Sequence, residues 1–245
     1  MSSETPEPYQ RLLTQYNELA ELAGSLAHEI KNPLSIIRMN MDLLAEDLAE
    51  AETPGERRAR NKIQVVQDQC KRLETLLNDF LKFARLRDLE MHSGNLNEQV
   101  EKVLDFFMPQ AIEMKINVIR YLDAELPSIL LDSKTLQAAL LNLVKNAFEA
   151  MPDGGELTVR SYATTSGVAL DFIDTGCGME QTTALKMFDA FYTTKEGGSG
   201  LGLSATRKII EAHGGLIQVQ SSVGRGTKFS LQFPRPPRIG SDLDA

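Results

Sequence analysis

Cysteine is scarce in this chain of 245 residues, and positive charge is in deficit. The two cysteines, Cys70 and Cys177, fall in a helical apolar pattern and in a glycine-rich loop, which argues against a disulfide framework. The 26 lysines and arginines against 34 aspartates and glutamates give a net charge of -8. A nonspecific nucleic-acid binder needs a basic surface, so this charge excludes that class.

Long apolar runs and a secretory leader are missing as well. No segment approaches the roughly 20 apolar residues that span a bilayer as a helix. Residues 1–8 form a polar, acidic leader without the character of a signal peptide. With the scarcity of cysteine, these absences predict a cytoplasmic protein without a membrane segment.

Residues 9–92 have the pattern of two long amphipathic helices. Apolar residues recur at steps of three and four over residues 9–51 and again after a tight turn at residues 52–55, so the two helices form an antiparallel hairpin. Pro33 predicts a bend in the first helix. Because two helices alone bury little, we expect two hairpins to pair as a four-helix bundle in a homodimer. The apolar seams are Leu12, Tyr16, Leu19, Ala23, Leu26, Ile30, Leu34, Ile37, Met41, Leu44, Leu48 and Ile63, Val66, Cys70, Leu73, Leu77, Phe80, Ala84.

One histidine of the first helix is displayed rather than packed. His28 lies between the seam residues Leu26 and Ile30, and at about 100° per residue it points away from the seam. A displayed imidazole is a candidate nucleophile or proton carrier, whereas a packing histidine would lie in the seam. Glu29 follows directly, and Asn32 lies one turn later on the same face.

The second half of the chain, residues 93–235, mixes helices and strands, and residues 236–245 form a loose tail. Helices are predicted over residues 96–114, 133–151 and 203–212. Strands are predicted over residues 116–122, 129–131, 157–163, 168–173, 217–221 and 227–233. A glycine-rich stretch covers residues 174–202.

Four separated segments of this half each suit one part of ATP. Asn142 and Asn146 share a helix face, and amide oxygens are hard ligands suited to Mg²⁺, although two solvated asparagines are an equal alternative. Asp174 follows an apolar strand, where its carboxylate can accept the exocyclic amine of adenine and would repel the carbonyl of guanine. Gly176 and Gly178 let the backbone approach the base; the alternative is an ordinary turn after a strand.

The third segment, residues 197–203, leads glycine-rich backbone into a helix. Free N–H groups and the positive end of the helix dipole favour phosphate there, whereas the alternative is a flexible linker. No Walker loop is present in the sequence. The fourth segment, Gly224 to Thr227, predicts a hairpin turn. Between them, Phe188 and Phe191 could anchor a lid from which Lys195 reaches a phosphate. The alternative is structural aromatics and a solvated lysine, and for Phe188 that alternative is favoured.

Taken in order, these segments closely resemble the catalytic core of a two-component sensor histidine kinase, over about residues 15 to 233. Residues 25–35 resemble the H box, 142–150 the N box, 174–178 the G1 box, 188–191 the F box, 198–203 the G2 box and 224–227 the last glycine box. The short lid is most similar to the nitrogen-regulator-like branch. Such kinases usually carry a sensor module before the H box, whereas about two dozen residues precede His28 here. The chain is therefore either a kinase driven by a partner or the core of a longer sensor.

The resemblance implies a dimeric four-helix bundle for phosphotransfer, then an α/β-sandwich ATP-binding domain with a mixed sheet covered on one face by helices. It implies ATP and Mg²⁺ as cofactors and the receiver domain of a response regulator as partner. His28 would accept phosphate, Glu29 would orient its ring, and Asn32 would direct water in a phosphatase reaction. Asn146 would hold the metal. The nucleotide would be bound by Asn142, Asn146, Asp174, Gly176, Gly178, Lys195, Gly198, Gly200, Leu201, Gly202 and Thr227.

Three alternatives remain open at this point. An ATPase or serine kinase on the same ATP fold would not need a displayed histidine, and a dimeric scaffold could bind a regulator without catalysis. His92 and His213 compete with His28 as phosphorylation sites, although both are expected at helix ends, where capping explains His213 better.

Overall fold

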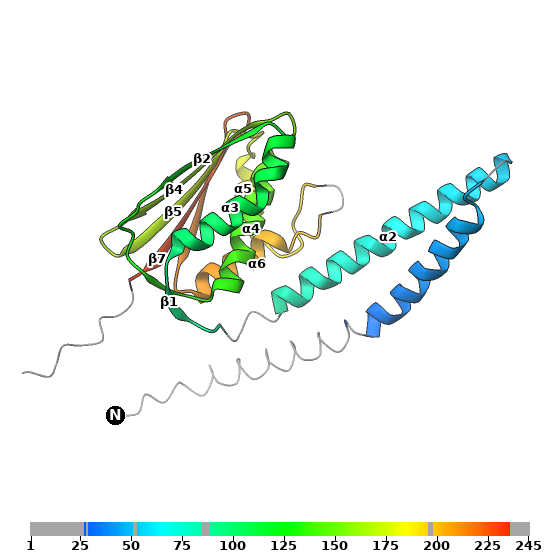
Figure 1. The fold of residues 1–245 in the computed structure, drawn as a ribbon, viewed down its shortest axis with the longest axis horizontal. Helices are drawn as coiled ribbons and strands as arrows, with labels where there is room; N and C mark the ends of the chain where they lie inside the picture. The colour runs from blue at the N-terminus through cyan, green and yellow to red at the C-terminus, as the bar shows by residue number, and fades with distance from the viewer. Residues whose placement is uncertain (1–26, 28, 51–52, 85–88, 196–197, 236–245) are drawn as a thin grey trace, which may run out of the picture. The chain divides into compact units, whose positions relative to one another are not determined.

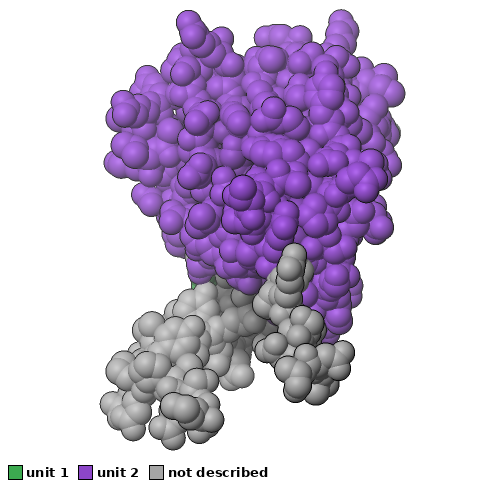
Figure 2. Space-filling model, turned by 90° about the vertical axis from the view of Figure 1, so that its left-hand side faces the viewer, with its two compact units in different colours: residues 1–85, 194–199 green, residues 86–193, 200–245 purple. Residues whose placement is uncertain are grey.

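The computed structural model describes residues 27, 29–50, 53–84, 89–195 and 198–235. The chain forms two compact units, residues 1–85 with 194–199 and residues 86–193 with 200–245. The second unit is drawn in purple in Figure 2. Within the described ranges, no helix is both long enough and apolar enough to cross a membrane.

The first unit contains the predicted antiparallel hairpin. A helix covers residues 29–47, and α2 (Pro54–Ala84) follows after a turn (Figure 1). A capping box starts α2: the Thr53 hydroxyl accepts from the Glu56 N–H at 3.2 Å, and the Glu56 carboxylate accepts from the Thr53 N–H at 2.9 Å. Pro54 takes the first helical position, where a missing N–H costs nothing.

Polar pairs fix the register of the two helices. Lys31 Nζ donates to Asn78 Oδ1 at 2.8 Å, and Gln67 Nε2 donates to Asp42 Oδ1 at 2.7 Å. Leu34 of the first helix and Cys70 of α2 are buried, but many other apolar side chains remain exposed along both helices. They are Ile30, Ile36, Ile37, Met39, Leu43, Leu44, Val65, Val66 and Leu73. One hairpin therefore covers only part of its apolar surface.

The second unit is built on a five-stranded sheet of order β2-β4-β5-β7-β6. Its strands are β2 (Ile116–Leu122), β4 (Gly155–Ala163), β5 (Gly167–Asp174), β6 (Leu216–Ser222) and β7 (Gly226–Pro234). β2 runs parallel to β4 and all other pairs are antiparallel, which confirms the predicted mixed sheet. A separate small sheet pairs β1 (His92–Gly94) with β3 (Ile129–Leu131).

Helices α3 (Leu96–Glu113), α4 (Ser133–Glu149) and α6 (Gly202–Ala212) cover one face of the large sheet (Figure 1). Alternate residues of β5 and β7 bury their side chains against these helices, in register across the two strands. The pairs are Val168 with Phe233, Leu170 with Leu231, and Phe172 with Phe229. This alternation places Asp174 and Thr227, the next register pair, on the helix-covered face at the end of the sheet.

Two short elements escaped the sequence prediction, namely β1 and α5 (Gln181–Lys186). His92 was expected at a helix end, and that expectation is wrong because it lies in β1. Three residues with the sequence His-Ser-Gly have no apolar alternation, so only the pairing with β3 makes them a strand.

His213 links the ends of α4 and α6. Asp132 caps α4 through its carboxylate, which accepts from the Thr135 N–H, and the Asp132 N–H donates to His213 Nε2 at 3.0 Å. His213 Nδ1 lies 2.7 Å from the Ile209 carbonyl, so Nδ1 carries the proton and Nε2 accepts. The ring is buried with both nitrogens engaged, and His213 is therefore a structural capping residue in this fold.

The other face of the sheet carries a buried carboxylate. Asp171 of β5 is fully buried beneath Arg160, whose guanidinium lies at 2.8 Å, and Lys228, whose ammonium lies at 3.1 Å. Burial works to raise the pKa of Asp171, but hydrogen bonds from Arg160, Ser230 and Lys228 outweigh it and lower that pKa overall. The ionised form is thus favoured by folding.

We expect Asp171→Asn to lower the free energy of unfolding by about 2 kcal/mol at neutral pH, because the charge-assisted bonds are lost. A lowered carboxyl pKa contributes stability above the ordinary value of about 4, and this stability is lost as the pH falls through the folded value. The difference in the free energy of unfolding between Asp171→Asn and the parent chain should therefore be smaller in acid than at pH 7. Urea unfolding at pH 7 and in acid measures it, and an equal difference at both pH values would contradict the assignment.

Candidate nucleotide site

Asp174 is held by one carboxylate oxygen and leaves the other free. Its Oδ1 accepts from the Gly176 N–H at 2.9 Å and from the Thr227 N–H at 3.1 Å. Within the described part of the chain, nothing hydrogen-bonds to Oδ2. Burial is the main cause of a raised pKa for this carboxyl, and the two N–H bonds oppose it. The two bonds to Oδ1 therefore hold the carboxylate in a fixed orientation. Its Oδ2 remains available as an acceptor on a largely buried side chain.

The loop after Asp174 requires its glycines because backbone packs on both sides of it. A Cβ at Gly176 would lie 2.6 Å from the Ala150 carbonyl, at the end of α4. Gly178 has a φ of 65°, and a side chain there would collide with the Ser222 carbonyl. The Cys177 N–H donates to the Ala150 carbonyl at 3.0 Å, so the loop is fixed to the end of α4.

The two asparagines of α4 occupy different environments. Asn142 Nδ2 donates to the Thr206 hydroxyl of α6 at 3.0 Å, and that hydroxyl in turn donates to the Gly202 carbonyl. Asn142 thus ties α4 to the N-terminal half of α6. Asn146 lies one turn further along α4 and is half-buried. Its amide oxygen suits the donor set of Mg²⁺, which takes few protein ligands and completes its shell with phosphate and water.

The glycine-rich segment enters α6 as predicted. Gly200 has a φ of 67°, and its carbonyl accepts from the Phe191 N–H at 3.0 Å. Leu201 is buried and precedes Gly202, the first residue of α6, without a side-chain cap for that helix end. Uncapped N–H groups at a helix N-terminus suit an anion. Lys195 and Gly198 belong to residues 194–199, which group with the first unit.

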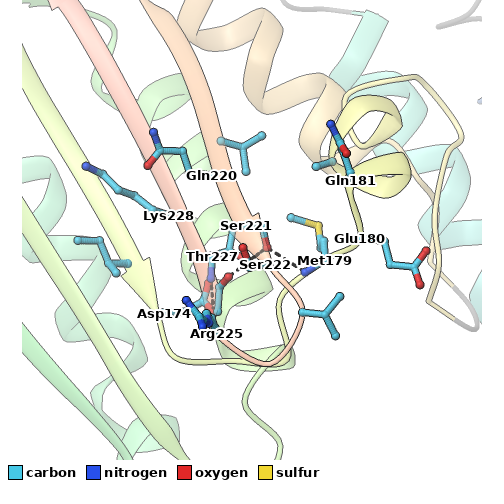
Figure 3. A pocket seen from close by; sticks show the side chains of 15 residues that line it. Asp174, Met179, Glu180, Gln181, Gln220, Ser221, Ser222, Arg225, Thr227 and Lys228 are labelled. Carbon is cyan, nitrogen blue, oxygen red and sulfur yellow. Dashed lines mark hydrogen bonds between the residues drawn. The ribbon is translucent and has the colours of Figure 1, made fainter.

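A hydroxyl that the sequence analysis missed lies beside Thr227, the register partner of Asp174. Ser221 Oγ accepts from the Met179 N–H at 2.9 Å, donates to the Gly226 carbonyl at 3.1 Å and lies 3.0 Å from Thr227 Oγ1 (Figure 3). These residues border a groove of about 790 Å³ that also reaches Glu180 and Lys228. The sequence did contain a signal for Ser221, because a hairpin turn over residues 223–226 places it near Thr227 across the two strands.

Thr206 was also missed, since its position within an apolar helix gave no hint of a bond to Asn142. The predicted phosphotransfer residues are only partly described. His28 lies outside the described residues, so its displayed position stays a prediction. Glu29 and Asn32 are exposed on the first helix. The described residues hold no cluster of three or more histidine, cysteine or acidic side chains that could bind a metal.

Comparison with known families matches both units. Residues 18–89 match the His Kinase A (phospho-acceptor) domain, and residues 131–237 match the histidine kinase-, DNA gyrase B- and HSP90-like ATPase. The chain is similar to the signal transduction histidine-protein kinase AtoS of Escherichia coli, at 32% identity over 94% of this chain and 37% of AtoS. It therefore spans less than half the length of that relative.

Among the similar solved structures, two cover most of the chain. Full-length ShkA in complex with AMPPNP has a TM-score of 0.69 and 28% identity, over 87% of this chain and 45% of ShkA. Histidine kinase ThkA in complex with the response regulator protein TrrA has a TM-score of 0.68 and 28% identity, over 98% of this chain and 70% of ThkA. With a phospho-acceptor domain followed by this ATPase domain, the chain belongs to the sensor histidine kinase family.

Proposed function

We propose that this chain phosphorylates itself on His28 from ATP and passes the phosphoryl group to an aspartate of a response regulator. The observation that carries the proposal is the aimed carboxylate of Asp174, whose vacant Oδ2 matches the exocyclic amine of adenine. The complex of ShkA with AMPPNP and that of ThkA with a response regulator support the two halves of the reaction.

In the proposed step, Nε2 of neutral His28 attacks the γ-phosphorus of ATP. A P–N bond forms, the bond to the bridging oxygen breaks, and ADP leaves with that electron pair. Glu29 would accept from Nδ1–H and stabilise the charge that develops on the ring. Asn146, Lys195 and the amides around Gly200–Gly202 would bind the phosphates, and Mg²⁺ would neutralise their charge when bound.

The hairpin would act as half of a homodimer. Its exposed apolar side chains, such as Ile37, Leu43 and Val65, lie along both helices, and a second hairpin would bury them in a four-helix bundle. We propose a cytoplasmic location for the chain, in agreement with its acidic charge and two unpaired cysteines.

The test is incubation of the purified chain with γ-labelled ATP, followed by a panel of receiver domains. Phosphohistidine is lost in acid and survives base, so an acid-labile label that moves to a receiver domain is the expected result. An acid-stable label would favour a serine kinase on the same fold. Absence of ATP binding would favour a non-catalytic scaffold.

We further propose that Asn32 supports dephosphorylation of the regulator by orienting a water molecule against its phospho-aspartate. Asn32 is exposed one helical turn after the position of His28, where a regulator can reach it. Asn32→Ala should slow dephosphorylation about tenfold or more and leave autophosphorylation near the parent rate.

Asn40→Ala is the matched control, because Asn40 is an exposed asparagine of the same helix whose amide bonds the Ile36 carbonyl. Both rates should stay unchanged in this variant. Dephosphorylation by Asn32→Ala at the rate of Asn40→Ala would remove Asn32 from the reaction.

A further inference from the structure

Ser221 uses all of its hydrogen-bonding capacity within the protein. A serine hydroxyl offers one donor and two acceptor lone pairs. The Gly226 carbonyl can only accept, so the Ser221 proton is directed to it, at an Oγ–O distance of 3.1 Å. The Met179 N–H occupies one Ser221 lone pair at 2.9 Å, and only the second lone pair remains for Thr227.

This saturation fixes the direction of the bond between the two hydroxyls. With the Ser221 proton committed, Thr227 Oγ1 must donate across the 3.0 Å that separates it from Ser221 Oγ. Thr227 is largely buried, and its side chain has no other hydrogen bond within the described ranges. Its hydroxyl therefore has no proton to offer a ligand and presents lone pairs only.

The consequence is a base subsite made of acceptors. Asp174 and Thr227 are register partners on the helix-covered face of the sheet, and the Thr227 N–H already bonds Asp174 Oδ1. Asp174 Oδ2 and Thr227 Oγ1 are thus two acceptors at the same end of the sheet, on side chains that both line the groove (Figure 3). An exocyclic amine has two N–H donors for such a pair, whereas a carbonyl at the same position of the purine would meet lone pairs on both sides.

We infer that Ser221 is a positioning residue, which favours a 6-amino over a 6-oxo purine nucleotide by fixing the direction of the Thr227 hydroxyl. Ser221 acts through Thr227 and does not contact the nucleotide. The inference rests on the proposed adenine site at Asp174, and it extends that site to a second acceptor whose direction a neighbouring strand controls.

The experiment compares the dissociation constants of ATP and inosine triphosphate, which carries a 6-oxo group, by calorimetry. In Ser221→Ala the Thr227 hydroxyl is free to rotate and donate, so the preference for ATP over inosine triphosphate should fall about tenfold. Ser221→Thr keeps a hydroxyl on a β-branched residue suited to a strand and should retain the preference. Ser222→Ala removes an exposed neighbouring hydroxyl and should also retain it.

Thr227→Val removes the second acceptor, Thr227 Oγ1, and provides an independent test. It should relax the preference to a similar extent, and the double variant with Ser221→Ala should show no further loss. Equal weakening of both nucleotides by Ser221→Ala would indicate a purely structural residue and overturn the inference, as would an unchanged preference. Failure of the parent chain to bind ATP would instead refute the proposed function, so the two failures are distinguishable.

Discussion

Asp174→Asn is expected to weaken ATP binding at least 100-fold while the protein stays folded. The asparagine oxygen can still accept from the Gly176 and Thr227 N–H groups that now bond Oδ1. Its amide nitrogen then replaces the free Oδ2 and points a donor at the amine of adenine. The variant loses a charged acceptor for the adenine amine and sets the amide N–H donors against the N–H donors of that amine. Together these two effects cost roughly 2.7 kcal/mol of binding free energy, or about 100-fold in affinity.

The same variant should not lose stability at neutral pH. Burial raises the pKa of Asp174, so its contribution to stability is fully present below the ordinary carboxyl pKa and is lost as the pH rises through the folded value. At pH 7 the ionised carboxylate therefore opposes folding, and the neutral amide should give a melting temperature equal to or above that of the parent.

Calorimetric titration with ATP and a thermal melt on each sample measure both effects. Asp171→Asn is the matched control, since it makes the same change three residues earlier on β5 but on the opposite face of the sheet. That control should lose stability and keep its ATP affinity at a temperature where it remains folded. If Asp174→Asn binds ATP with the affinity of the parent chain, the Asp174 carboxylate does not recognise adenine.

His28→Ala is expected to abolish acid-labile labelling, by more than 1,000-fold, and to leave ATP affinity unchanged. The nucleophile is lost in this variant, whereas the groups around Asp174 belong to the other compact unit. Labelling with γ-labelled ATP and titration with ATP report the two properties separately.

The sequence contains three histidines, which makes the control direct. His92 is exposed in β1, and His92→Ala should keep full labelling. His213 has both ring nitrogens bonded, to Ile209 and Asp132, and offers no free nucleophile. Labelling that persists in His28→Ala and disappears in His92→Ala would move the phosphorylation site to β1.

Periodicity predicted the large elements well because each long strand or helix buries one face. The alternation of Val168, Leu170 and Phe172 in β5 is visible in the sequence, and so is the helical spacing in α4. The parallel pairing of β2 with β4 was not accessible in this way, since it depends on partners that are distant in the sequence. Strand β1 escaped for the same reason.

The site was predictable as a set of residue types but not as a set of bonds. Asp174 was singled out because a carboxylate follows an apolar strand, yet the sequence did not reveal which oxygen is engaged. Asn142 was assigned to the nucleotide, whereas the structure shows its amide also bonded to Thr206 across two helices. The predicted hairpin placed Ser221 near Thr227, but its bonds to Met179 and Gly226 became visible only in the structure, where two strands and a loop meet.

The exposed apolar stripe of the hairpin makes the helical unit dependent on the amount of protein present. Ile36, Met39 and Val65 are each more than half exposed in a single chain, so in the proposed homodimer association would supply part of the free energy that holds the helices together. The ATP-binding unit has its own closed core and does not share this dependence. Dilution should therefore melt the helical unit first and leave the ATP-binding unit folded.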